Sequence, residues 1–168
     1  MILDSFCFSL WQQIVLVLLR FSIGWHLFCQ GFGKMYAVAW TSQSYLAASS
    51  GPFSGFFQTA AEEITLVKFS DGLVIWGLMI LGLLLMMGLW TQTAALLGSL
   101  MLLLFYIAAP PLGQGGFMVA TVEGTEFYVN KTLIEAFALL VVLSFPTGRI
   151  LGLDIWFQSW RINRHRKD

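Results

Sequence analysis

The stretch GLVIWGLMILGLLLMMGLW, residues 72–90, contains no charged side chain. A second apolar stretch, TAALLGSLMLLLFYIAA (93–109), begins only two residues later. A helix that crosses a membrane needs about 20 mostly apolar residues. Because the connection is so short, we predict two antiparallel membrane-spanning helices here, the second of which ends at Pro110 and Pro111.

The composition of the whole chain agrees with a membrane location. Of its 168 residues, 58% are hydrophobic and 11% are charged, whereas soluble domains have about 25% charged residues. The length suits a single domain over residues 1–168 and leaves no room for a separate soluble enzyme domain. The formal net charge is zero, so no overall basic field indicates a nucleic-acid partner.

Two further apolar stretches complete a predicted bundle. The first covers about residues 10–32 and contains Arg20, and the last covers about 129–146, where Pro146 ends it. The N-terminus lacks the basic region and small-residue cleavage site of a secretory signal, so we expect the first stretch to be retained. The predicted fold is therefore an all-α integral membrane protein, a bundle of four transmembrane helices.

Two segments outside the spans have an amphipathic composition. The segment 33–70 is rich in aromatic and small residues, and we predict a helix after Pro52 that lies on the membrane surface or caps the bundle. After Pro146, the sequence ILGLDIWFQSW (150–160) predicts a C-terminal interfacial helix.

The basic residues predict the orientation. The tail RINRHRKD (161–168) carries three arginines and a lysine, and basic segments of this kind stay on the cytoplasmic side. With four spans the N-terminus is cytoplasmic as well. The segments 33–70 and 110–130 then face outward, and we expect a bacterial inner-membrane protein with both termini inside.

A polar stripe runs down the first predicted span. At about 100° per residue, Arg20, Gly24, Leu27, Gly31 and Lys34 lie close to one line along the helix. An arginine near the bilayer centre costs about 2.5–3.5 kcal/mol, so we expect Arg20 to have an internal partner. The alternatives are that the glycines only permit close helix packing, that Arg20 reaches along a neighbour to the interface, and that Lys34 anchors the interface.

Glu135 is the partner that we predict for Arg20, because it lies in the outer half of the fourth span and no other carboxylate falls within an apolar core. Lys34 or Lys131 could pair with it instead. One hypothesis is an outward-facing polar pocket between helices, lined by Arg20, Lys34, Glu135 and Tyr106. The other is a charge pair that only fixes the register of the helices.

Metal and nucleophile chemistry have no support in the sequence. His26 is expected to be a packing residue, because the other histidine, His165, is in the opposite tail. No cluster of His, Cys and carboxylate residues has the spacing of a metal site, and no phosphate-binding loop or nucleophile motif occurs.

Three sequence motifs, in their order and spacing along the chain, resemble those of one family. The pattern Arg20-x3-Gly24-x6-Gly31-x2-Lys34, together with YIAAPP (106–111) and EGTEFYVNKTLIEAFALLVV (123–142), is similar to that of DoxX/DoxD-like membrane proteins over about residues 10–145. The residues that match the family pattern, and that we take as candidate ligand-binding residues together with Tyr106, are Arg20, Gly24, Gly31, Lys34, Asn130 and Glu135.

The resemblance implies a four-helix bacterial inner-membrane protein like a subunit of thiosulfate:quinone oxidoreductase. On this basis the first hypothesis is a membrane subunit of a redox system that binds quinone or a small anion. The chain has no electron-transfer cofactor motif, so the redox centre would be quinone or belong to a partner. The alternative is a non-catalytic scaffold, accessory or chaperone subunit, as in relatives of the wider superfamily. Both hypotheses imply a partner subunit or a homo-oligomer, and whether the chain is an enzyme stays open.

Overall fold

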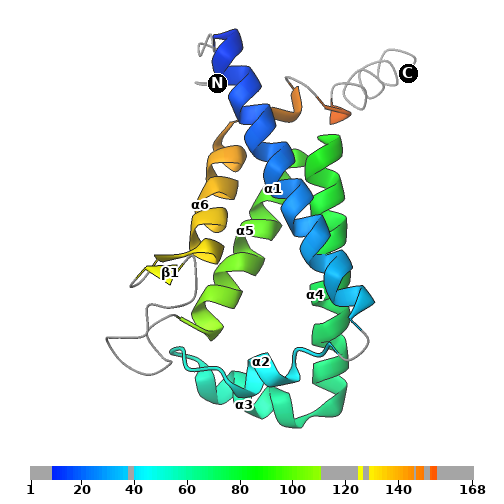
Figure 1. The fold of residues 1–168 in the computed structure, drawn as a ribbon, viewed down its shortest axis with the longest axis vertical. Coiled ribbons are helices and arrows are strands. Elements are labelled where there is room, and N and C mark those ends of the chain that lie inside the picture. Colours follow the sequence, from blue (N-terminus) through cyan, green and yellow to red (C-terminus); the bar gives the residue numbers. More distant parts are fainter. Residues whose placement is uncertain are drawn as a thin grey trace, which may run out of the picture.

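The protein is built from helices, with one short hairpin before the last of them (Figure 1). The computed structural model describes residues 9–37, 40–110, 125–126, 129–145, 147–149 and 152–154. The elements are, in chain order, α1 (Leu10–Tyr36), α2 (Gln43–Ala47), α3 (Ser54–Glu62), α4 (Ile64–Met87), α5 (Thr91–Ala108), β1 (Thr125–Glu126), β2 (Val129–Asn130), α6 (Lys131–Ser144) and the 3₁₀ turn η1 (Thr147–Arg149). The two strands pair antiparallel.

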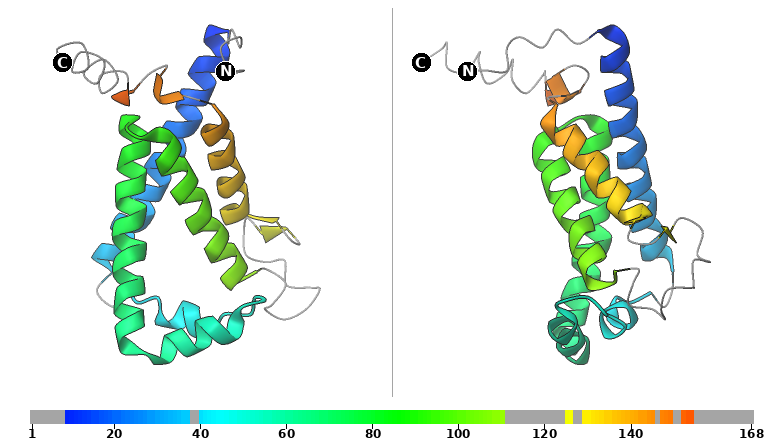
Figure 2. Two further views of the ribbon diagram at one scale, coloured as in Figure 1. Left: turned by 180° about the vertical axis from the view of Figure 1, so that it is seen from behind. Right: turned by 90° about the vertical axis from the view of Figure 1, so that its left-hand side faces the viewer.

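The long helices form two packed pairs. Helix α1 packs along α4, and α5 packs along α6. A short turn joins the end of α4 to the start of α5, and the two helices diverge from this turn. The bundle is therefore closed at one end and splayed at the other (Figures 1 and 2). Helices α2 and α3 lie across the splayed end. The start of α1 and the end of α6 lie together at the closed end.

Three of the described helices, α1, α4 and α5, are long and apolar enough to cross a membrane, so the chain is a multi-pass membrane protein. The fourth span that we predicted over 129–146 is not confirmed. Helix α6 has 14 residues, which is about 21 Å at the usual rise per residue and less than the hydrocarbon thickness of about 30 Å. It begins only at Lys131, because the preceding residues are paired as β2 and the Asn130 side chain caps the helix.

Local sequence explains where the helices begin and end. Ser9 and Gln12 form a capping box at the start of α1. The side chain of Asn130 accepts a hydrogen bond from the Leu133 amide at 2.9 Å and caps α6. Helix α4 ends at Gly88, whose φ of 66° is the left-handed conformation that favours glycine. Helix α4 also begins eight residues before the apolar stretch that predicted it, because Lys68 and Asp71 interrupt the apolar pattern of its first two turns, which lie beside α3.

Close packing between α1 and α4 depends on small residues. A Cβ at Gly24 would lie 2.9 Å from the carbonyl oxygen of Gly82, and a Cβ at Gly31 would lie 2.8 Å from that of Ile75. Both distances are too short for a side chain, so these glycines allow the two backbones to touch. The core continues from this contact toward α5 and α6, and its largest fully buried apolar side chains are Leu27, Leu85, Leu139 and Val142.

The closed end is a densely packed layer that we call the end plate: the α4–α5 turn (88–90), residues 147–149 and residues 152–154. The Asp154 carboxylate accepts hydrogen bonds from the amides of Trp90 (2.8 Å) and Thr91 (3.3 Å) and from the Thr91 hydroxyl (2.8 Å). A carboxylate from the segment that follows η1 thus caps the start of α5.

Helices α2 and α3 are held to the splayed end by hydrogen bonds to the last turn of α5. The Ser49 hydroxyl donates to the Ala108 carbonyl oxygen at 2.7 Å, and the Tyr45 hydroxyl donates to that of Phe105 at 2.6 Å. The helix predicted after Pro52 is confirmed as α3, whose Phe56 is 73% exposed. Its place on a membrane surface stays a prediction. The tail 161–168 and most of the expected interfacial helix at 150–160 lie outside the described residues.

Candidate functional site

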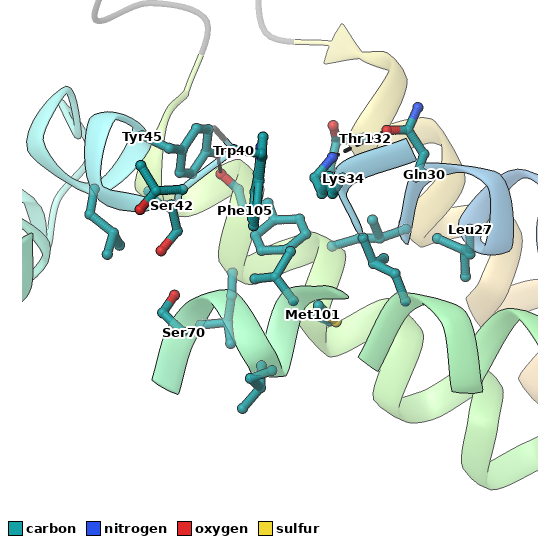
Figure 3. A pocket seen from close by; sticks show the side chains of 18 of the residues that line it. Leu27, Gln30, Lys34, Trp40, Ser42, Tyr45, Ser70, Met101, Phe105 and Thr132 are labelled. Atoms are coloured by element: carbon teal, nitrogen blue, oxygen red, sulfur yellow. Dashed lines mark hydrogen bonds between the residues drawn. The ribbon is translucent and has the colours of Figure 1, made fainter. Parts of the chain in front are cut away.

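A cavity of about 740 Å³ lies at the splayed end of the bundle, and helix α2 covers part of it (Figure 3). The cavity exists because α4 and α5 diverge there and α6 begins too late to fill the space between them. Its volume falls within the usual range for small-molecule sites, about 300–1,000 Å³. Most of the wall is apolar, with side chains that include Leu27, Leu73, Val74, Leu78, Met101, Leu102 and Phe105.

One side of the cavity carries charged groups. Helices α1 and α6 contribute five side chains there that contact one another, and we call this group the pocket cluster: His26, Gln30, Lys34, Lys131 and Glu135.

His26 is the centre of the pocket cluster. Its Nδ1 atom contacts Oε1 of Glu135, while its Nε2 atom lies 2.8 Å from Nζ of Lys131 and 3.1 Å from Nε2 of Gln30. A lysine ammonium can only donate hydrogen bonds, so Nε2 is the accepting nitrogen of the ring. The proton of the neutral imidazole is then on Nδ1, which donates to the Glu135 carboxylate. The imidazole thereby joins a carboxylate on one side to an ammonium on the other.

Lys34 is at the other end of the pocket cluster. Its ammonium donates to Oε1 of Gln30 at 3.3 Å and lies 5.4 Å from the centre of the Trp40 ring, which also lines the cavity. The Gln30 amide therefore connects Lys34 to His26, because its nitrogen faces His26 and its oxygen faces Lys34. The spacing of four residues between His26, Gln30 and Lys34 places all three on one side of α1.

Arg20 does not lie in this cavity. Its side chain is 2% exposed and reaches the end plate, where a Cβ at Gly88 would lie 3.1 Å from the guanidinium. The acidic group whose charge acts on it is Asp154. The pairing of Arg20 with Glu135 that we predicted is wrong, since Glu135 contacts His26 instead. The physical reason is that α1 begins beyond the α4–α5 turn (Figure 1), so the middle of α1 is level with the end of α4.

The structure distributes the other candidate residues over three places. Gly24 and Gly31 lie in the contact between α1 and α4 and do not line the cavity. Asn130 caps α6 next to the cavity. Tyr106 is half-buried on α5 outside the lining. Of the candidates, the structure brings Lys34 and Glu135 to the same cavity.

Sequence reasoning missed part of the site. His26 was expected only to pack, although the four-residue spacing from His26 through Gln30 to Lys34 was visible and is typical of one helix face. Trp40 and Tyr45 lie on the segment that covers the cavity, and no local pattern indicates which way that segment folds back. Burial raises the pKa of the Tyr45 hydroxyl, which donates to the last turn of α5.

The described residues contain no group of three or more His, Cys, Asp or Glu side chains that could hold a metal ion. Comparison of the chain with protein-family models, with curated proteins and with solved structures gives no match.

Proposed function

We propose that this membrane protein binds an amphipathic small molecule in the cavity at the splayed end of the bundle. The observation that carries the proposal is the division of the cavity into a largely apolar wall, formed by α4 and α5, and a charged side, formed by the pocket cluster. A ligand with an apolar body and a polar head group matches this division. A small free anion would leave most of the apolar wall in contact with water.

A quinone is the class of ligand that we favour. Its carbonyl oxygens accept hydrogen bonds, and the pocket cluster presents donors from Lys34 and Lys131. Its ring and tail are apolar, like the wall around Leu78 and Phe105. When bound, a quinone would supply two-electron redox chemistry, and the protein's own residues would hold and orient it. The resemblance to DoxX/DoxD-like proteins supports a role as a membrane subunit of a redox system with a partner subunit.

The alternative is a scaffold or accessory subunit that holds another protein through α3. The exposed aromatic residues Phe53 and Phe56 favour it, because a partner can cover such a face. A partner retained in mild detergent without a bound lipophilic molecule would support the scaffold over the ligand-binding subunit.

We also propose a bacterial inner-membrane location with both termini in the cytoplasm. The start of α1 and the end of α6 lie at the same end of the bundle (Figure 1), which supports this topology. A reporter fused after Asp168 should behave as cytoplasmic, and one inserted near Ser50 as external. The opposite pattern would contradict the orientation.

The binding proposal is tested with the full chain in lipid nanodiscs and a neutral probe, a 2-methyl-3-alkyl-1,4-naphthoquinone, by isothermal titration. We expect saturable binding to the parent protein. Leu78→Trp should abolish it, because Leu78 lines the cavity and is 3% exposed. Leu100→Trp is the matched control, since Leu100 is 50% exposed on the outer face of α5.

Because Leu78→Trp places a large side chain in the core and could prevent folding, Ser70→Trp provides a second test at the half-buried rim of the cavity. Equal binding to the parent, Leu100→Trp and a folded Ser70→Trp variant would contradict the cavity as the site. Absence of binding to the parent would contradict the quinone class.

A further inference from the structure

We propose that the ligand of this cavity has an anionic head group and that the Lys34 ammonium binds it. This inference rests on the proposed function, because it concerns the same cavity, and it narrows the ligand from amphipathic molecules in general to amphipathic anions. It also gives Lys34 a role in specificity rather than in anchoring the helix at the interface.

The charges of the pocket cluster do not balance. Glu135 carries the negative charge, and Lys34 and Lys131 carry positive charges, while the hydrogen-bonding pattern of His26 requires a neutral imidazole. Glu135 and Lys131 bracket His26, one on each ring nitrogen, so their charges compensate each other across the ring. One positive charge remains, and it belongs to Lys34.

The groups that the Lys34 ammonium contacts among the described residues are neutral. In the part of the chain that the structure describes, its ammonium contacts the amide oxygen of Gln30 and the ring of Trp40, and no carboxylate lies within ion-pair distance. A half-buried cation beside an apolar wall has lost part of its hydration. An anionic group of a ligand would replace the lost hydration with a charge-assisted hydrogen bond.

The direction of the Lys34 side chain separates this proposal from an anchoring role. A lysine that anchors a helix extends its ammonium outward to the head-group layer. The ammonium of Lys34 instead turns back by one helical turn to Gln30, and Figure 3 shows both residues at the cavity together with Trp40. Gln30 is in turn fixed by His26, so the position of the cation is set by the pocket cluster.

The ligand chemistry that fits is an anion carried on a flat or extended apolar body. Two examples are a long-chain carboxylate and an alkylated naphthoquinone with an ionised ring hydroxyl. The second is useful as a probe, because the 2-hydroxy-3-alkyl and 2-methyl-3-alkyl naphthoquinones have the same body and differ in the charge of the head group.

The experiment measures the dissociation constants of these two probes for the full chain in nanodiscs of zwitterionic lipid at neutral pH. We expect the ionised 2-hydroxy probe to bind more tightly than the 2-methyl probe by about tenfold or more, as for a hydrogen bond between charged groups. Lys34→Gln should remove this preference, because the glutamine amide can donate a hydrogen bond to either head group but carries no charge. Lys34→Arg should retain the preference.

The matched control is Lys68→Gln, which removes an exposed lysine of α4 that does not line the cavity and should leave the preference unchanged. Equal affinities of the two probes for the parent, or a preference that survives in Lys34→Gln, would overturn the inference while the binding proposal stands. Failure of both probes to bind would instead overturn the proposed function and the inference with it.

Discussion

The end plate and the pocket cluster are two polar regions beside the same helix, α1, but only one of them is filled. At the end plate, the guanidinium of Arg20 lies beside Gly88 of the α4–α5 turn and within the field of Asp154, and residues 147–149 and 152–154 cover this turn. At the pocket cluster, His26 and Lys34 face a cavity. The difference follows from the divergence of α4 and α5, which brings backbone together at one end and separates it at the other. Charge in a membrane helix therefore indicates a site only where the neighbouring helices leave space.

The end plate should be the region whose loss destabilises the protein most. Asp154→Ala removes the acceptor for two amides and the Thr91 hydroxyl, and the acidic neighbour of Arg20. Asp154 is half-buried, and the loss of three hydrogen bonds to a charged acceptor, at about 1–1.5 kcal/mol each, costs about 3–5 kcal/mol. Among Asp154→Ala, Gly31→Ala, Glu135→Gln and Tyr45→Phe, we expect Asp154→Ala to have the largest fall in melting temperature, measured by thermal unfolding in mild detergent. Asp154→Asn keeps one accepting oxygen, so its melting temperature should lie between those of the parent and of Asp154→Ala. An unchanged melting temperature in Asp154→Ala would show that the end plate is not held by this carboxylate.

The contact between α1 and α4 joins the two regions and offers a matched pair of variants. A Cβ at Gly31 would lie 2.7 Å from Cγ of Met79 and 2.8 Å from the Ile75 carbonyl oxygen, whereas a Cβ at Gly33 would meet nothing within 4 Å. Gly31→Ala should therefore destabilise the protein by about 1–3 kcal/mol through overpacking. Gly33→Ala should be neutral or slightly stabilising, because alanine favours a helix. Equal effects of the two variants in the same detergent melt would mean that α1 and α4 are not in backbone contact.

The pocket cluster should tolerate substitution better than the end plate. In Glu135→Gln, the amide oxygen still accepts from Nδ1 of His26, and water in the cavity can solvate Lys131. We expect a loss of about 1–2 kcal/mol, in the range of a single weakened hydrogen bond to a charged group. The loss should be smaller than that in Asp154→Ala under the same conditions. A larger loss would mean that the cluster is a structural charge network, and would remove the contrast between the two regions.

The parts of the fold that the sequence predicts are those with a strong local signal. The uninterrupted apolar runs identify α4 and α5, and the proline and small residues after 51 indicate α3. The apolar run at 129–146 was longer than α6, because Asn130 caps the helix and the residues before it pair as strand β2. The capping asparagine was visible in the sequence, and it would have shortened the prediction.

The candidate site was harder to predict, because it depends on the relative depth of helices. The stripe through Arg20 and Lys34 correctly links two residues on one side of α1, yet the structure places them in different regions. A periodicity argument gives the face of a residue and says nothing about its level against a neighbouring helix. Once Arg20 is level with the end of α4, Glu135 is free to contact His26. The fold of α2 over the cavity, with Tyr45 against α5, is a tertiary contact without a local signal.

The smallest expected effect concerns helix α2, which covers part of the cavity at the splayed end. The Tyr45 hydroxyl donates to the Phe105 carbonyl oxygen at 2.6 Å, and burial raises the pKa of this phenol above its ordinary value. The folded state therefore favours the neutral form, and the stabilisation is fully present below the unfolded pKa of about 10 and is lost as the pH rises through the folded pKa. Tyr45→Phe should cost about 0.5–1.5 kcal/mol at pH 8, and no more, because the Phe105 carbonyl oxygen also accepts from the Ala109 amide. Melting temperatures of the parent and of Tyr45→Phe, compared from pH 8 upward, should converge above pH 10, and the comparison cancels the titration of other groups. A difference that stays constant over this range would mean that the phenol does not hold α2 to α5, and that α2 is held over the cavity by other contacts, such as those of Ser49 with Ala108 and of Ser42 with Asp71.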